Sequence, residues 1–226
     1  MSILVVTGTD TDVGKTVVTA AIAARRLATG DTVAVVKPAQ TGVGPHDDGD
    51  LAEVRRLAGE LSLHEGVRLP DLLAPDTAAR VAGMALPSLQ EQAGLVTRAA
   101  DDRDLTIVEG AGGILVNLGE NWTLLDLADV VRRRGHDVAC VVVVRAGLGT
   151  LNHATLTVRA IQARGIEVTG LVVGAWPAEP GPAEVHNLED LPRLTGVPVL
   201  GRVPEKASAL PVEEFRRQAR GWLAGL

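Results

Sequence analysis

The residues whose types best suit chemistry lie near the start of the chain and read Gly8-Thr9-Asp10-Thr11-Asp12-Val13-Gly14-Lys15-Thr16. The apolar run 3–6 before them predicts a buried strand, and the Ala-rich run 17–28 after them predicts a helix. A glycine loop between a strand and a helix presents backbone N–H groups and a helix N-terminus to a phosphate. In such a P-loop, Lys15 would contact the β- and γ-phosphates and the Thr16 hydroxyl would ligate Mg²⁺. A plain turn is the alternative, and the strand-to-helix position argues against it.

The loop departs from the usual phosphate-binding spacing. Five residues separate Gly8 from Gly14, where the standard motif has about four, and Thr9 stands at a usual glycine position. Asp10 and Asp12 place carboxylates beside a phosphate site, an arrangement that makes electrostatic sense only if they face cations or amines. We therefore expect a variant of the loop.

A second cation follows the next apolar run, 33–36, in the segment Lys37-Pro38-Ala39-Gln40-Thr41-Gly42. Carboxyl ends of parallel strands meet at one edge of a sheet, so Lys37 is expected on the edge that carries the P-loop. Taken alone, this position is equally typical of a surface lysine and of a second lysine directed at phosphate.

Two acidic residues are candidate magnesium ligands. Glu109 follows the apolar run 105–108 and precedes a glycine-rich turn, which resembles a Walker-B carboxylate. Asp50 opens the helical pattern 51–57 and has capping-box spacing with Glu53, so it is either a helix cap, a metal ligand or both.

The acids before Asp50 are less specific. Asp47 and Asp48 are either solvated loop charges or alternative ligands, and His46 is interpreted as a loop histidine.

Three later loops follow predicted strands and are expected at the same edge. Gly147 and Gly149 predict a turn, with Asn152 as the cap of a helix that runs to residue 164. The other two loops contain Gly174-Ala175 and Pro204-Glu205, which stand where P-loop proteins often read the nucleotide base.

Apolar runs alternate with helical patterns along the chain, which predicts an α/β fold with a mostly parallel sheet flanked by helices. The last run contains Pro198 and is expected to be a short or edge strand. Residues 175–182 predict a surface loop, and the 226 residues predict a single domain. The expected strands are 3–6, 33–36, 105–108, 138–144, 168–173 and 197–200.

Composition excludes several classes of protein. The net charge of −6 and the four large aromatic residues argue against a nucleic-acid partner. Cys140, the single cysteine, lies in an apolar run, so no intrachain disulfide is expected. No apolar run has the length of a membrane span, and no signal peptide is apparent, so a cytoplasmic protein is expected.

The four segments together resemble the dethiobiotin synthetase family over essentially the whole chain. The resemblance implies a three-layer P-loop NTPase-type fold, and a ligase that converts 7,8-diaminononanoate, CO₂ and ATP into dethiobiotin, ADP and phosphate with Mg²⁺. It implies a carbamate, then a carbamic–phosphoric anhydride, and ring closure by the second amine. The segments that carry it are 8–16, 37–42, 108–113 and 147–153.

The resemblance also implies roles for particular residues. Lys15 and Lys37 would flank the transferring phosphate and the carbamate. The substrate would lie at a homodimer interface and contact Thr11, Lys37, Thr41, Leu148 and Asn152, the last two from the partner subunit. Mg²⁺ would be held by Thr16, Asp50 and Glu109. The nucleotide would contact Asp12, Val13, Gly14, Lys15, Thr16, Val17, Asp50, Glu109, Gly110, Ala111, Gly112, Gly174, Ala175, Pro204 and Glu205.

One departure from the family concerns the base. Many members carry an Asn after the fifth predicted strand, and here Gly174-Ala175 supplies no side-chain amide. Base recognition would then fall to backbone groups, and nucleoside triphosphates other than ATP become candidate substrates.

Three rival functions remain open on sequence. A ParA/MinD-like switch ATPase would carry a lysine where Asp10 stands and would lack the 37–42 segment. A cobyrinate-type amidoligase would need a glutaminase domain with a nucleophilic cysteine. A non-catalytic nucleotide-binding protein is disfavoured because both lysines and all three metal candidates are present.

Overall fold

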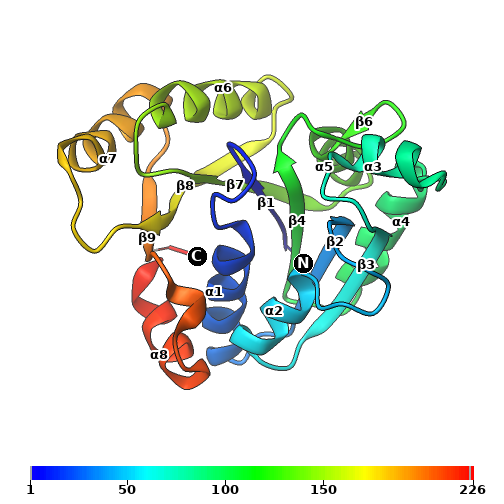
Figure 1. The fold of residues 1–226 in the computed structure, drawn as a ribbon, viewed down its shortest axis with the longest axis horizontal. Coiled ribbons are helices and arrows are strands. Elements are labelled where there is room, and N and C mark those ends of the chain that lie inside the picture. Colours follow the sequence, from blue (N-terminus) through cyan, green and yellow to red (C-terminus); the bar gives the residue numbers. More distant parts are fainter. Residues whose placement is uncertain (1, 224) are drawn as a thin grey trace.

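The computed structural model describes residues 2–223 and 225–226. Its centre is a parallel sheet of seven strands in the order β3-β2-β4-β1-β7-β8-β9 (Figure 1). Strand β1 lies in the middle, so the P-loop that follows it leaves the sheet at its centre. The strands are β1 (Ser2–Gly8), β2 (Val33–Thr41), β3 (Ser62–Leu69), β4 (Leu105–Gly113), β7 (Asp137–Val144), β8 (Glu167–Trp176) and β9 (Val199–Pro204).

Helices cover both faces of the sheet and each face has its own apolar core. One core joins the sheet to α1 (Lys15–Ala28), α2 (Asp50–Ala58) and α8 (Val212–Trp222). The other core joins it to helices on the opposite face. The architecture is a three-layer α/β fold, as predicted. The helices on the second face are α4 (Leu89–Ala100), α5 (Leu124–Arg133), α6 (Thr150–Gln162) and α7 (Pro182–Thr195).

Smaller elements complete the chain. Helix α3 (Pro75–Ala82) packs beside a two-stranded sheet of β5 (Asn117–Gly119) and β6 (Trp122–Thr123). A 3₁₀ turn, η1 (Ala207–Ala209), precedes α8. Among the residues that the structure describes, no helix is both long and apolar enough to cross a bilayer.

All six predicted strands are present in the central sheet; its seventh strand, β3, and the short strands β5 and β6 of the second sheet were not predicted. Strand β3 is an edge strand whose residues are mostly half-buried, so it has no continuous apolar run. Strand β9 is the opposite edge, as predicted, but it begins at Val199, after Pro198. The predicted surface loop at 175–182 is shorter, because β8 continues to Trp176 and α7 begins at Pro182.

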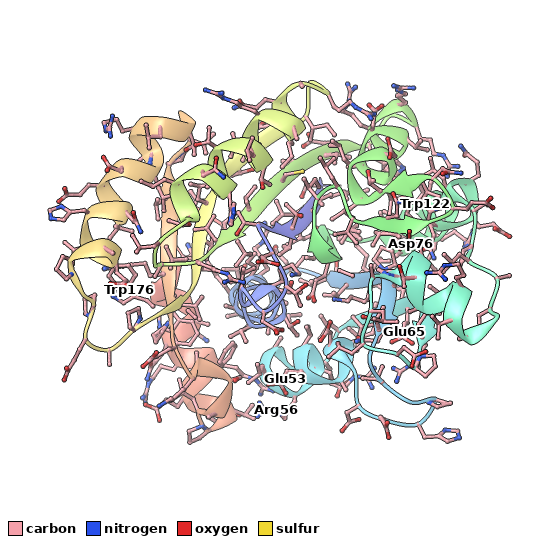
Figure 2. The ribbon with its side chains drawn as sticks, turned by 45° about the horizontal axis from the view of Figure 1, so that its top comes forward. Glu53, Arg56, Glu65, Asp76, Trp122 and Trp176 are labelled. Carbon is pink, nitrogen blue, oxygen red and sulfur yellow. The ribbon has the colours of Figure 1, made fainter. Side chains whose placement is uncertain are left out.

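Two predicted helix caps are wrong. Gly49 is the N-cap of α2, and the Glu53 carboxylate pairs with Arg56 on the outer side of the helix (Figure 2). Gly149 is the N-cap of α6, in a left-handed conformation, so Asn152 lies in the first turn with its side chain exposed. In both places a glycine without a side chain begins the helix, and rules based on capping side chains miss it.

Strand β2 is irregular where it approaches the P-loop. It pairs with β3 as far as Thr41, but its pairing with β4 ends at Val36. Val36 and Ala39 belong to the same core, although a regular strand would turn residues three apart to opposite faces. The break coincides with Pro38, which has no N–H to donate to a ladder. The carboxyl end of β2 therefore separates from the carboxyl end of β4. The candidate site lies between these two strand ends.

Candidate active site

The P-loop joins β1 to α1 through backbone conformations that favour a tight turn. Gly14, the N-cap of α1, has φ of 95°, and Asp12 has φ of 56°, a left-handed value that aspartate tolerates better than most residues. Lys15 is the first helical residue and is buried, and its Nζ donates to the carbonyl of Asp10 over 2.9 Å. Burial, followed by repulsion from Lys37, lowers the pKa of Lys15 to about 8. An anion placed against this amine would favour its charged form.

The P-loop rests directly on strand β8. A Cβ atom on Gly174 would lie 2.0 Å from the carbonyl oxygen of Val13, and one on Gly14 would lie 2.6 Å from the carbonyl oxygen of Gly174. Both glycines are therefore required by close backbone approach. Gly174 is buried beneath the loop, whereas Ala175 is exposed.

Three predicted residues meet beside the P-loop in an ionic cluster in which Lys37 and Glu109 are buried and the Asp50 side chain is 36% exposed. The Lys37 Nζ lies 2.5 Å from Asp50 Oδ2 and 2.8 Å from Glu109 Oε1, and it also donates to the carbonyl of Gly110 over 3.1 Å. The Thr16 hydroxyl donates to the same Glu109 Oε1 over 2.9 Å. The cluster thus joins β2, α2, β4 and α1.

Burial makes the charges of this cluster interdependent. The side chains of Lys37 and Glu109 are 3% and 0% exposed. Burial alone would lower the pKa of Lys37, but the carboxylates of Glu109 and Asp50 more than offset it, so the pKa lies above its usual value. Lys37 is therefore firmly cationic in this arrangement, and its charge balances part of the negative charge around it.

The cluster also fits a divalent cation. Glu109 Oε2 is buried and has no hydrogen-bond partner among the described residues. A hydroxyl and two carboxylates supply the hard oxygen ligands that Mg²⁺ prefers. The described residues contain no group of three or more His, Cys, Asp or Glu placed to hold a metal. A cation held by Thr16, Asp50 and Glu109 would thus depend on nucleotide phosphates and water for its other ligands, which is usual for Mg²⁺.

A cavity of about 560 Å³ contains most of these groups. Its lining includes predicted residues, namely Thr11, Asp12, Gly14, Lys15, Thr16, Lys37, Thr41, Asp50, Ala111 and Gly112. It also includes residues for which the sequence predicted no role, namely Ala39, Gln40, Leu72, Leu73, Ala74, Pro75 and Val116. The segment 72–75 was missed because it follows β3, the strand that has no apolar run.

The remaining predicted residues lie outside this cavity. Val13 is buried within the P-loop, and Val17 is half-buried in the first turn of α1. Leu148 and Asn152 are exposed on the β7–α6 loop and on α6. Pro204 and Glu205 are exposed at the end of β9, where the Glu205 N–H donates to the carbonyl of Trp176 over 2.8 Å.

An aromatic residue marks this β8–β9 side of the site. The guanidinium carbon of Arg202 lies 4.8 Å from the centre of the Trp176 ring, a cation–π contact. In Figure 2, α1 is seen end-on, with Trp176 to its left and with Glu65 and Asp76 to its right. The P-loop therefore separates the cavity, on the side of β2 and α3, from the loops after β8 and β9.

Comparison with known proteins identifies the family. The family model described as an AAA domain matches residues 2–211. The ATP-dependent dethiobiotin synthetase BioD of Rhodococcus jostii (strain RHA1) is 54% identical over 98% of this chain and 94% of its own length. The chain belongs to the dethiobiotin synthetase family. The dethiobiotin synthetase of Streptomyces coelicolor (strain ATCC BAA-471 / A3(2) / M145) is 51% identical over 99% of this chain and 92% of its own length.

Solved structures show that this dethiobiotin synthetase family member shares its fold with P-loop ATPases. The septum site-determining protein MinD of Pyrococcus horikoshii OT3, complexed with Mg-ADP, has a TM-score of 0.60 at 14% identity, covering 97% of this chain and 90% of its own. A ParA family ATPase from Chlorobium tepidum TLS has a TM-score of 0.58 at 12% identity, with 97% and 90% covered. These distant similarities concern the fold alone.

Proposed function

We propose that the protein is a ligase of biotin synthesis that uses Mg-ATP and CO₂ to convert 7,8-diaminononanoate into dethiobiotin, ADP and phosphate. The observation that carries the proposal is the position of the Lys37 amine, between Asp50 and Glu109 in the cavity that holds the P-loop lysine. Phosphoryl transfer to a carbamate gathers negative charge at one point, and two converging lysines supply the matching positive charge.

Nucleotide binding is assigned to the P-loop. The backbone N–H groups from Asp12 to Val17 and the N-terminus of α1 would hold the phosphates, and Lys15 would turn from the Asp10 carbonyl to the β- and γ-phosphates. Ala111 and Gly112, at the end of β4, line the same cavity, whereas the side of Gly110 that lacks a side chain packs against Leu124.

The ionic cluster suggests that Lys37 has two positions, one paired with the carboxylates and one directed at the substrate. In the described arrangement its amine is taken up by Asp50, Glu109 and the Gly110 carbonyl. Mg²⁺ bound by Thr16, Asp50 and Glu109 would supply charge neutralisation for the phosphates. The Lys37 amine would be placed to contact the carbamate and the transferring phosphoryl group once its ion pairs with Asp50 and Glu109 are weakened.

The other walls of the cavity suit an aliphatic diamine. Leu72, Leu73 and Val116 offer apolar contacts for a hydrocarbon chain, and Thr11 and Thr41 line the same space. The carboxylates of Asp12 and Asp50 line this cavity and favour the approach of amino groups, whereas Asp10 is paired with Arg145.

A homodimer would bring Leu148 and Asn152 to the substrate of the partner subunit. Several leucines that project into solvent support an interface on this end of the sheet, with 86% of Leu148, 81% of Leu72 and 62% of Leu115 exposed. Exposed large apolar side chains are a feature of protein–protein contacts when they form a patch.

Base selection is proposed to depend on backbone groups. Gly174 supports the P-loop, and Ala175, Pro204 and Glu205 offer exposed backbone beside Trp176. Because none of these supplies a side-chain amide, CTP and GTP are to be compared with ATP as substrates.

The experiment is phosphate release from Mg-ATP and bicarbonate, with and without 7,8-diaminononanoate. Diamine-dependent release, dethiobiotin in the mass spectrum, and loss of both in Lys37→Ala or after EDTA are expected. Arg193→Ala, which breaks an exposed ion pair with Asp190 on α7, is the matched control and should retain activity. Equal ATP turnover without the diamine, and no dethiobiotin, would instead favour a switch ATPase.

A further inference from the structure

Gln40 is a buried polar residue of the cavity for which the reaction above has no use. Its side chain is 5% exposed. The Oε1 atom accepts the backbone N–H of Asp50 over 2.8 Å, and the Nε2 atom donates to the carbonyl of Thr41 over 3.1 Å. Both ends of the amide are therefore engaged, and one of them holds a proposed metal ligand.

Asp50 needs such a partner because of how α2 begins. The first N–H groups of a helix have no acceptor within the helix, and a capping side chain normally supplies one. The N-cap of α2 is Gly49, which has no side chain. A Cβ atom on Gly49 would lie 2.8 Å from Gln40 Oε1, so the glycine leaves the space that Gln40 occupies. The cap of α2 thus comes from strand β2.

The irregularity at Pro38 explains how β2 delivers two side chains to one residue. In a regular strand Lys37 and Gln40 would point to opposite faces, because they are three residues apart. Here Lys37 contacts the Asp50 carboxylate and Gln40 contacts the Asp50 N–H. Asp50 is therefore tied to β2 at both its side chain and its backbone.

We propose that Gln40 is a positioning residue, which holds Asp50 at the cation site when the ion pair between Lys37 and Asp50 is weakened. The inference rests on the proposed function only in taking Asp50 as a ligand of Mg²⁺. A cation bound by the Asp50 carboxylate would repel the Lys37 amine and weaken its contact with Asp50 Oδ2, and the Gln40–Asp50 hydrogen bond would then keep the start of α2 in place. A neutral amide suits this task because it neither repels the cation nor competes for the carboxylate.

The test measures Mn²⁺ binding, by electron paramagnetic resonance, to protein saturated with a non-hydrolysable ATP analogue. Gln40→Ala removes the acceptor and is expected to raise the Kd for Mn²⁺ about 10-fold, as for other residues that support metal ligands. Gly49→Ala keeps Gln40 but displaces its Oε1, and the same increase is expected. Thr195→Ala, which removes a buried hydroxyl at the end of α7, on the opposite face of the sheet from α2, is the matched control: it should lower Tm and leave the Kd unchanged.

A double variant separates positioning from simple capping. Ser at an N-cap accepts N–H groups one turn into the helix, so Gly49→Ser combined with Gln40→Ala would cap α2 without tying Asp50 to β2. The expected result is a recovered Tm with Mn²⁺ binding still weak. Recovery of both, or an unchanged Kd in Gln40→Ala and Gly49→Ala, would overturn the proposal. Because Mn²⁺ binding is measured without turnover, absence of dethiobiotin in the wild type would refute the proposed function separately.

Discussion

The P-loop lies on Gly174 with no space for a side chain, so a single methyl group added there is expected to weaken nucleotide binding. In Gly174→Ala the new Cβ would lie 2.0 Å from the Val13 carbonyl oxygen and 2.6 Å from a methyl group of Val143. Ordinary contact begins at 3.4 Å, so the loop or β8 must move by about 1.4 Å. Overpacking of this kind lowers the free energy of unfolding by about 1–3 kcal/mol. Because a misplacement of about 1 Å in a positioned group costs about 100-fold in rate, we expect the Kd for Mg-ATP to rise by up to about 100-fold.

The assay is calorimetric titration of Mg-ATP into Gly174→Ala, with thermal unfolding of the same sample. Gly221→Ala is the matched control, because nothing lies within 4 Å of a Cβ built there. That control lies inside α8, so it should raise the free energy of unfolding by about 0.5–1 kcal/mol and leave ATP affinity unchanged. Wild-type ATP affinity in Gly174→Ala would refute the reasoning, because the contact would then be one that the loop can relieve freely.

Three further predictions concern the ionic cluster, the exposed rim and the buried thiol. Lys37→Met leaves the fully buried Glu109 without its cation, so the free energy of unfolding, measured in urea, should fall by about 3–5 kcal/mol. A fall of less than about 1 kcal/mol would mean that water replaces the lysine. The proposed homodimer predicts that wild-type protein is dimeric by light scattering. Leu148→Glu, which puts a charge on a residue that is 86% exposed, should then give monomers with little change in Tm, whereas dimers in the variant would place the interface elsewhere and a monomeric wild type would refute the dimer. Burial raises the pKa of Cys140 to about 12, so the thiolate is scarce from pH 7 to 9. A disulfide reagent should therefore label this thiol in denaturant but not in the native protein, and rapid labelling of the native protein would contradict this.

The sequence predicted the central strands because each is buried on both faces and reads as an apolar run. Val33 to Val36 and Val138 to Val144 are of this kind. Strand β3 escaped prediction because one of its edges is unpaired and its residues are half-buried. Because β3 was not predicted, the segment 72–75 that follows it, which forms the apolar wall of the cavity, was not predicted to have a role either.

In the candidate site, too, local sequence patterns predicted which residues lie at the site but not the contacts between elements. Strand ends indicated that Lys37 and Glu109 would share one edge, and the helix start at Asp50 was a candidate metal ligand near them; the structure brings the charged atoms of all three together. The sequence could not show that Lys37 lies between the two carboxylates, since that depends on the irregular course of β2. Nor could it show that Gln40 caps α2, because that contact joins two elements and needs a glycine at position 49.

The place of β1 in the sheet has a consequence for how the chain folds. The first strand is flanked by β4 and β7, and β7 begins only at Asp137. At a synthesis rate of about 5–20 residues per second, on the order of ten seconds pass between the synthesis of β1 and α1 and that of β7, the later of the two strands that flank β1. Helix α8, which packs against α1, arrives later still. Nascent chains should therefore hold unpaired strand edges for a long interval, and folding is expected to be slow and to depend on chaperones that shield them.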